Sequence, residues 1–385
     1  MIELAFLYLI LRRRLGNCLE HLSYDALDSW IDTKAGTRLW VPTLSLVLLL
    51  GACFYVRLDT VCVHHGAFFA GMTADPFTFS GSNPVACRIL TPVLSYLIGL
   101  RHGSQICLTN LIIAGSLLGA VYTYFKREAV RPGDAFVATV AIASSLVVLS
   151  IMGSPGYTDV TSYLLIFLMW WQKSRRWLFY GLFLLALLNH EWVLFMLPWL
   201  VFVSTEDCRS KPKLVVEMTI GFGLPVLAYY CFREWVTSQQ ELKFTVDFYL
   251  KPFLSHPFRD FLLTLPYHSL GWFSVFKAMW IVPVVALTHA WSSGSRRTSM
   301  SIMLLLASSW AALAVARDTS RMFTLGFMVM PVALQYLFQT GARRFHSWIL
   351  WVLLLNLIIP QFVNSGHIMV VWNSVSTHIV EWLIR

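Results

Sequence analysis

The sequence predicts an all-α integral membrane protein, a bundle of about 10–12 spanning, re-entrant or juxtamembrane helices, and three observations lead to this prediction. First, only 13% of the 385 residues are charged and 57% are hydrophobic, whereas a soluble protein has roughly 25% charged residues. Second, the apolar residues form long runs such as 136–152 and 301–316, and a spanning helix needs about 20 mostly apolar residues. Third, Trp and Tyr cluster near the ends of these runs, as in the aromatic belt of a membrane interface.

Short groups of lysine and arginine separate the apolar runs, and short basic loops stay on the cytoplasmic side of a membrane. The groups lie at 12–14, 34–38, 126–131, 173–176, 209–213, 296–297 and 343–344. One threading of the chain leaves all of them inside. It has a first span over 40–56, an external loop over 57–103 and the remaining helical bundle over 104–385. We therefore expect one integral membrane domain over residues 1–385.

The stretch 84–100 is apolar, yet this threading requires that it does not cross the membrane. It carries Pro84, Arg88 and Pro92, which are poor residues for a plain spanning helix. We expect a juxtamembrane or re-entrant helix here. The run 177–203 has basic groups at both ends and is interrupted by the polar residues 189–191, so we expect two short helices that turn at that point.

The other apolar runs are expected to alternate in direction across the membrane. Outward runs lie at 136–152, 214–232, 301–316 and 348–359, and inward runs lie at 106–125, 160–171, 271–290 and 322–338. The segment 233–268 is expected outside. The amphipathic tail 364–385 is expected on the outer surface.

The threading gathers ionisable residues at the outer, non-cytoplasmic face. They are Asp59, His64, His65, Asp75, Arg88, Asp159, His190, Glu191, Asp318 and Arg321. An ionisable group at membrane depth costs several kcal/mol unless it is paired or hydrated, so such residues often mark a site or a pathway. Their convergence on one face indicates a candidate functional site there.

Each of these residues also has a purely structural explanation. Asp159 precedes an apolar run and is placed to cap a helix. Asp318 and Arg321 have the spacing of a salt bridge along one helical turn. His190 and Glu191, at the turn of an apolar hairpin, are harder to explain by solvation, although they could cap the two broken helices. A surface position alone would account for Asp59, His64 and His65.

The formal net charge of +9 does not indicate nucleic-acid binding, because the basic residues are spread over the short loops between apolar runs. The seven cysteines are scattered singly, without the spacing of a zinc site. No cofactor is required by any motif. The sequence leaves open a divalent cation at Asp59 and Asp75.

Three segments resemble a known family: DPFTFSGSNPVACRILTPVLSYLIGL (75–100), GYTDVTSYLLIFL (156–168) and DTSRMFTLGFMVMPVAL (318–334). They are similar to stretches of bacterial polytopic glycosyltransferases of the GT-C superfamily. The resemblance implies a sugar donor linked to polyprenyl phosphate, a glycan, lipid or protein acceptor, a multi-pass location in the bacterial cytoplasmic membrane, and an active face on the non-cytoplasmic side. It also implies a catalytic carboxylate in the first external loop, where Asp59 is the positional match and Asp75 the second candidate.

In the mechanism that the resemblance implies, Asp59 or Asp75 deprotonates the acceptor hydroxyl and arginines hold the leaving phosphate. The expected catalytic residues are Asp59, Asp75, His190 and Glu191. The expected substrate or phosphate contacts are Arg88, Asp159, Asp318, Arg321, His64 and His65. Three other functions stay open: a transporter or flippase for a lipid-linked substrate, a glycan polymerase or ligase, and a structural subunit. A transporter would spread its polar residues through the depth of the membrane.

Overall fold

The computed structural model describes residues 65–79, 81–128, 131–154, 156–205, 215–241, 259–313, 319–340, 343–365 and 368–371. The first predicted span, 40–56, lies outside the described residues, and so do Asp59, His64 and Asp318. His65 begins the first described helix, but its side chain is outside the description. The predictions for these residues therefore stay predictions.

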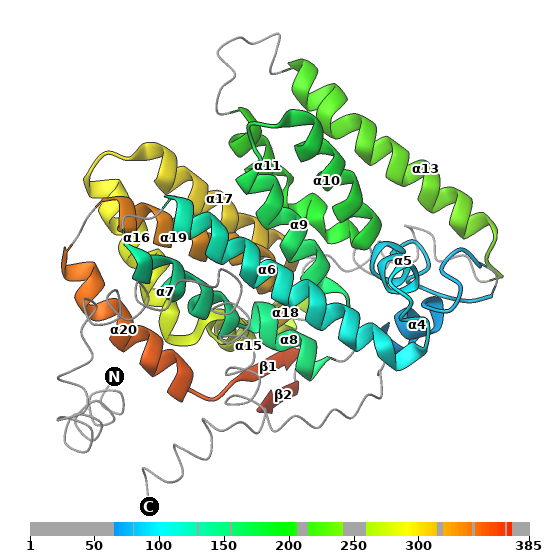
Figure 1. Ribbon diagram of the computed structural model, residues 1–385, viewed down its shortest axis with the longest axis horizontal. Helices are drawn as coiled ribbons and strands as arrows, with labels where there is room; N and C mark the ends of the chain where they lie inside the picture. The colour runs from blue at the N-terminus through cyan, green and yellow to red at the C-terminus, as the bar shows by residue number, and fades with distance from the viewer. Residues whose placement is uncertain are drawn as a thin grey trace, which may run out of the picture.

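The described part of the chain is almost entirely helical (Figure 1). The first half contains α4 His65–Met72, α5 Leu90–Leu97, α6 Ile106–Glu128, α7 Pro132–Ala143, α8 Leu146–Gly153, α9 Asp159–Trp171, α10 Arg176–Asn189 and α11 Leu197–Ser204. The second half contains α13 Leu224–Ser238, α15 Arg259–Phe276, α16 Ile281–Ser292, α17 Arg296–Leu313, α18 Thr319–Thr324, α19 Val329–Gln339 and α20 Arg343–Ile358. Short 3₁₀ or π-helical turns join several of them: η1 Gly103–Gln105, η2 Glu191–Met196, η4 Glu217–Gly223, η5 Lys277–Trp280 and η6 Leu325–Met328.

Within the described residues, three continuous helical stretches are long and apolar enough to cross a membrane. They are Gly103–Glu128, Leu265–Ser292 and Ser320–Gln339. Shorter apolar helices pack around them, at Gly133–Ala143, Asp159–Trp171, Arg176–Asn189, Glu191–Ser204 and Trp348–Ile358. The described part of the chain is thus helical, with three helices that by length and composition could cross a membrane.

The helices α9 and α10 pack against each other as a hairpin (Figure 1). They have 13 and 14 residues, so each is only about 20 Å long, shorter than the hydrocarbon core of about 30 Å. The four-residue link between them carries Lys173 and Arg175. Since this basic link closes one end of the hairpin, Asp159 and Asn189 lie together at the opposite end.

Two sequence-based expectations concern the segments next to this open end. The run 177–203 breaks into α10 and η2–α11 at His190, as the interruption at 189–191 predicts. In the stretch 84–100 the structure has α5, a helix of eight residues, which at about 1.5 Å per residue is too short to cross a bilayer. Both segments bring loop backbone and polar side chains to the same end of the hairpin.

A single large apolar core holds the bundle together, and α6, α7, α9 and α19 contribute much of it. Aromatic rings are prominent: Tyr124 packs on Trp170 with ring centroids 4.6 Å apart. One glycine is required by close packing. A β-carbon added to Gly326 would lie 2.1 Å from the hydroxyl oxygen of Ser309, so only glycine lets η6 approach α17 this closely.

A two-stranded antiparallel hairpin follows α20 and departs from the all-α prediction. Strand β1, Phe362–Ser365, pairs with β2, Ile368–Val371, with Phe362 opposite Val371. The sequence predicts an amphipathic tail over 364–385 and gives no clear sign of the hairpin. The apolar run IMVV after a short polar stretch is too brief to separate strand from helix by periodicity. Residues 372–385 lie outside the described part of the chain.

Candidate functional site

Asn189, the last residue of α10, fixes the geometry at the open end of the hairpin. Its side chain is fully buried. The amide donates to the carbonyl oxygen of Thr158 at 2.9 Å and to the hydroxyl of Ser162 at 2.7 Å, and its carbonyl accepts from the hydroxyl of Thr91 at 2.7 Å. The Thr161 hydroxyl lies 2.6 Å from that of Thr91. This network ties the end of α10 to the start of α9 and to α5.

His190 makes the sharp turn from α10 into η2. Its backbone is extended, with φ −164° and ψ 124°, and its Nδ1 accepts a hydrogen bond from the backbone N–H of Trp192 at 3.3 Å. Burial lowers the pKa of His190 to about 3, and the positive charge of Arg88 acts in the same direction. A neutral imidazole agrees with Nδ1 acting as an acceptor, which leaves Nε2 as the protonated nitrogen.

Glu191, the next residue, meets Arg88 in a two-point contact. The Nε of Arg88 donates to Oε2 at 2.9 Å, and Nη2 donates to Oε1 at 2.6 Å. Arg88 lies in the turn just before α5, where its backbone N–H bonds the carbonyl oxygen of Val85 at 2.9 Å. Paired parallel hydrogen bonds of this kind are the strongest contact that a guanidinium makes with a carboxylate.

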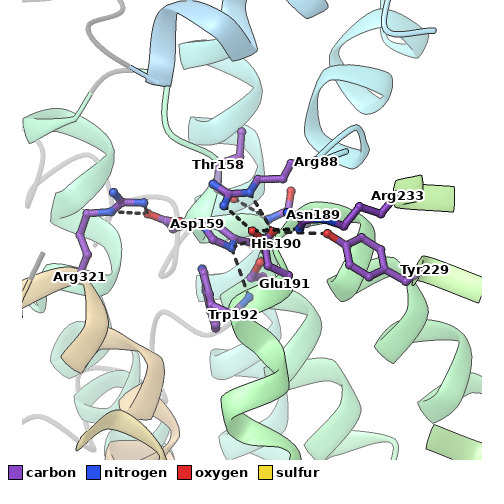
Figure 2. A network of polar contacts seen from close by, with 11 residues as sticks. Arg88, Thr158, Asp159, Asn189, His190, Glu191, Trp192, Tyr229, Arg233 and Arg321 are labelled. Atoms are coloured by element: carbon purple, nitrogen blue, oxygen red, sulfur yellow. Dashed lines mark hydrogen bonds and ion pairs between the residues drawn. The ribbon is translucent and has the colours of Figure 1, made fainter. Parts of the chain in front are cut away.

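Two residues of α13 complete the surroundings of Glu191 (Figure 2). The hydroxyl of Tyr229 lies 3.5 Å from Oε2, and Nη1 of Arg233 lies 3.6 Å from Oε1. Neither residue was predicted as part of the site. The sequence does hold a sign of their role, because a tyrosine and an arginine four positions apart share one face of a helix, and here that helix is largely apolar.

A second arginine–carboxylate pair lies on the other side of His190 (Figure 2). Nε and Nη2 of Arg321 contact Oδ2 of Asp159 at 2.8 and 2.7 Å. The guanidinium of Arg321 also lies over the ring of Tyr157, 4.2 Å from its centroid. The sequence predicts a salt bridge between Arg321 and Asp318, and this stays a prediction because Asp318 lies outside the described residues. The pair with Asp159 was not predicted.

The expected site residues thus fall into three groups. Arg88, Asp159, His190, Glu191 and Arg321 come together, as their placement on one face predicts. Asp75 has local contacts: its carboxylate accepts from the hydroxyl of Thr78 and from the backbone N–H of Phe77 at 3.3 Å. Asp59, His64 and Asp318, and the side chain of His65, lie outside the description.

Cys87 lies beside this cluster. Burial raises the pKa of its thiol to about 11, so the sulfur stays protonated at neutral pH. Among the described residues no three His, Cys, Asp or Glu side chains gather as metal ligands do. The chemistry that the described cluster offers is therefore arginine, carboxylate, imidazole and phenol. No protein-family model matches the sequence, and the comparison with curated proteins gives no match.

Proposed function

We propose that this protein is an integral membrane glycosyltransferase that takes a sugar from a polyprenyl-phosphate donor at the non-cytoplasmic face. One observation carries the proposal. Three arginines, Arg88, Arg233 and Arg321, reach the same cluster from three separate segments of the chain. Guanidinium groups suit phosphate because their planar fork matches two of its oxygens.

The position of the cluster supports an active face on the outside. Asp159 and Asn189 lie at the end of the α9–α10 hairpin opposite the basic link that carries Lys173 and Arg175. Basic links of this kind stay in the cytoplasm. The cluster then faces the other side, and the short length of α9 and α10 allows it to lie below the membrane surface, within reach of a lipid head group.

The exposed face of α13 supports a lipid-linked substrate. Tyr229 and Arg233 point toward Glu191, whereas Leu224, Leu227 and Trp235 of the same helix are exposed. In a bilayer, exposed apolar side chains face the acyl chains. A polyprenyl tail lying along this face would bring its phosphate close to Arg233 and Arg88.

The reaction that follows is displacement at the anomeric carbon. The acceptor oxygen forms a bond to that carbon, the bond to the phosphate oxygen breaks, and the phosphate keeps the electron pair. The arginines would stabilise the negative charge that grows on the phosphate. The acceptor proton would pass to a carboxylate, for which Asp59 and Asp75 are the candidates from sequence, and Glu191 is the more exposed of the two carboxylates in the described cluster.

The test is a transfer assay with the purified protein in detergent. Radiolabelled polyprenyl-phosphate sugars would be added one at a time, and loss of label from the lipid would be followed with and without acceptor. Turnover that is lost in a folded Asp59→Asn, Asp75→Asn or Glu191→Gln variant supports the proposal and identifies the base. Turnover that survives all three substitutions would contradict a carboxylate base at these positions.

A transporter for lipid-linked anions is the second candidate, and one observation favours it. Lys277 is buried within the spanning stretch Leu265–Ser292, where its positive φ of 47° accompanies the break at η5. Broken helices and buried ionisable residues are typical of transporters. However, Lys277 also has a structural role, because its Nζ donates to the carbonyl oxygen of Ile359 just after α20 at 3.0 Å. Transport of labelled lipid between leaflets of proteoliposomes, without chemical change, would favour this candidate.

A further inference from the structure

The carboxylate of Glu191 sits among donors that come from two other segments of the chain. Arg88 holds it by two hydrogen bonds of 2.6 and 2.9 Å, and Tyr229 and Arg233 approach it to 3.5 and 3.6 Å. These donors surround a small, planar anion. We propose that Glu191 occupies the position of the substrate phosphate, and that the phosphate of the lipid carrier displaces this carboxylate and binds Arg88, Arg233 and Tyr229. This inference rests on the proposed function.

The two anions are interchangeable at such a site for a geometric reason. The guanidinium fork binds two oxygens of a carboxylate or two oxygens of a phosphate in the same plane. Arg88 already presents Nε and Nη2 in that arrangement. Arg233, at 3.6 Å from Oε1, is beyond hydrogen-bonding distance of the carboxylate, and the additional oxygens of a phosphate would give it a closer partner.

Of the two acidic residues in the cluster, Glu191 is more exposed than Asp159, so we expect its carboxylate to be the one that the phosphate displaces. The side chain of Glu191 is 29% exposed, whereas that of Asp159 is 6% exposed. Asp159 belongs to the first turn of α9, and its partner Arg321 is stacked on Tyr157. Burial on this scale fixes the Asp159–Arg321 pair. The carboxylate of Glu191 lies closer to solvent and can turn outward as the incoming phosphate takes its place beside Arg88 and Arg233.

The charges around Glu191 favour the exchange as the reaction proceeds. Arg88 and Arg233 carry two positive charges, and Glu191 neutralises one of them. A sugar linked through a phosphodiester carries one negative charge, and the phosphate that leaves carries up to two. Once Glu191 has turned away, two guanidinium groups match the product phosphate better than the donor. The site would then stabilise the charge that develops in the transition state.

The proposed exchange and a purely structural Arg88–Glu191 salt bridge lead to different effects of Glu191 substitutions on phosphate binding. An internal anion that competes with the ligand lowers the apparent affinity by the fraction of time it occupies the site. Removing its charge in Glu191→Gln should therefore tighten phosphate binding, roughly tenfold if the carboxylate occupies the arginines about 90% of the time. If Glu191 only supports the fold, the same substitution would leave binding unchanged or weaken it.

The experiment measures Kd for farnesyl phosphate, inorganic phosphate and farnesol with the full-length protein in detergent, by microscale thermophoresis. Glu234→Gln is the matched control, since it removes a carboxylate from an exposed position next to Arg233. We expect Glu191→Gln to tighten farnesyl phosphate binding about tenfold, with no change in Glu234→Gln and none for farnesol. Tighter binding of inorganic phosphate as well would show that the site recognises the phosphate group alone. Tighter binding of farnesyl phosphate only would show that the site recognises the phosphate of a lipid head group.

Gel filtration and thermal unfolding would show whether each variant is folded. If Glu191→Gln does not fold, Glu191→Asp gives the same test, because its shorter side chain keeps the charge but reaches Arg88 less well. Unchanged or weaker farnesyl phosphate binding in a folded Glu191 variant would overturn the exchange, as would equal tightening in Glu234→Gln. The readout is independent of turnover. Tighter binding in Glu191→Gln, with no sugar transfer by the unsubstituted protein, would support the exchange and count against the glycosyltransferase. Sugar transfer by the unsubstituted protein, without tighter binding in Glu191→Gln, would do the opposite.

Discussion

Arg88 and Glu191 lie 103 residues apart in the chain and meet through two hydrogen bonds of 2.6 and 2.9 Å. Arg88 precedes α5 and Glu191 begins η2. Their contact therefore ties the short helix α5 to the break between α10 and η2–α11. Both segments are too short to span a membrane. The pair therefore marks the place where helix ends and loops, rather than continuous spans, supply the chemistry.

The first prediction concerns the shape of the Arg88 side chain. Arg88→Lys keeps the positive charge but replaces a two-point fork by a single ammonium group, which cannot reproduce the paired contact. We expect kcat/KM for transfer from a polyprenyl-phosphate sugar to fall by about 10- to 100-fold, which corresponds to about 1.4–2.8 kcal/mol. Initial rates at limiting donor concentration would measure it.

The control for this substitution is Arg101→Lys. Arg101 is an exposed arginine of the same region, and its guanidinium lies over the ring of Tyr96 at 4.1 Å. A loss of the same size in Arg101→Lys would show that the effect reflects general charge or stability rather than the fork of Arg88.

The sequence predicts several of the residues that gather in this cluster, but it does not predict which of them pair with each other. The basic loops predict which helix ends face outward, and this prediction alone groups Arg88, Asp159 and Arg321 on one face. The partner choices were not predictable, because Arg321 meets Asp159 through tertiary packing across 162 residues. Tyr229 and Arg233 were missed for a similar reason. They lie in the middle of a largely apolar helix, and only the packing of α13 against α10 turns them toward Glu191.

The second prediction concerns the buried pair of Asp159 and Arg321. Removing one partner leaves the other charge buried without compensation, so Asp159→Asn and Arg321→Gln should each reduce the free energy of unfolding by about 3 kcal/mol. The double variant should lose clearly less than the sum of the two. Denaturation in mixed micelles, followed by tryptophan fluorescence, would give the three values, and strictly additive losses would contradict a direct interaction.

The third prediction concerns Asn189. In Asn189→Asp the amide donor becomes a carboxylate oxygen, which cannot donate to the carbonyl oxygen of Thr158, so this buried hydrogen bond is lost and two acceptors face each other. We expect a loss of about 2–4 kcal/mol in unfolding free energy. We also expect weaker farnesyl phosphate binding, because Asn189 positions the His190–Glu191 turn.

Asn356→Asp is the matched control for Asn189→Asp. Asn356 is also fully buried, and it bonds the hydroxyl of Ser144 at 3.0 Å and the backbone N–H of Met279 at 3.3 Å, away from the cluster. It should lower stability to a similar degree and leave the Kd for farnesyl phosphate unchanged in the folded fraction. Equal weakening of binding in both variants would mean that Asn189 acts only through global stability.

The fourth prediction concerns pH. The pKa of His190 is lowered to about 3 by burial and by Arg88, whereas an unfolded histidine titrates near 6.5. Between these values the unfolded chain binds a proton that the folded protein does not, so His190 contributes stability that is complete above about pH 6.5 and declines as the pH falls. The limiting slope is about 1.4 kcal/mol per pH unit. We expect the melting temperature to fall from pH 6.5 to pH 5, a window above the usual titration of carboxylates.

In His190→Asn this decline should be shallower, because asparagine does not titrate and its side-chain oxygen can still accept the backbone N–H of Trp192. The comparison of the two slopes isolates His190 from the other histidines of the chain. Parallel slopes would mean that the folded protein protonates His190 over the same pH range as the unfolded chain does. In that case its Nδ1 could not accept the Trp192 hydrogen bond, and the imidazolium would add a further positive charge beside Arg88 and Glu191.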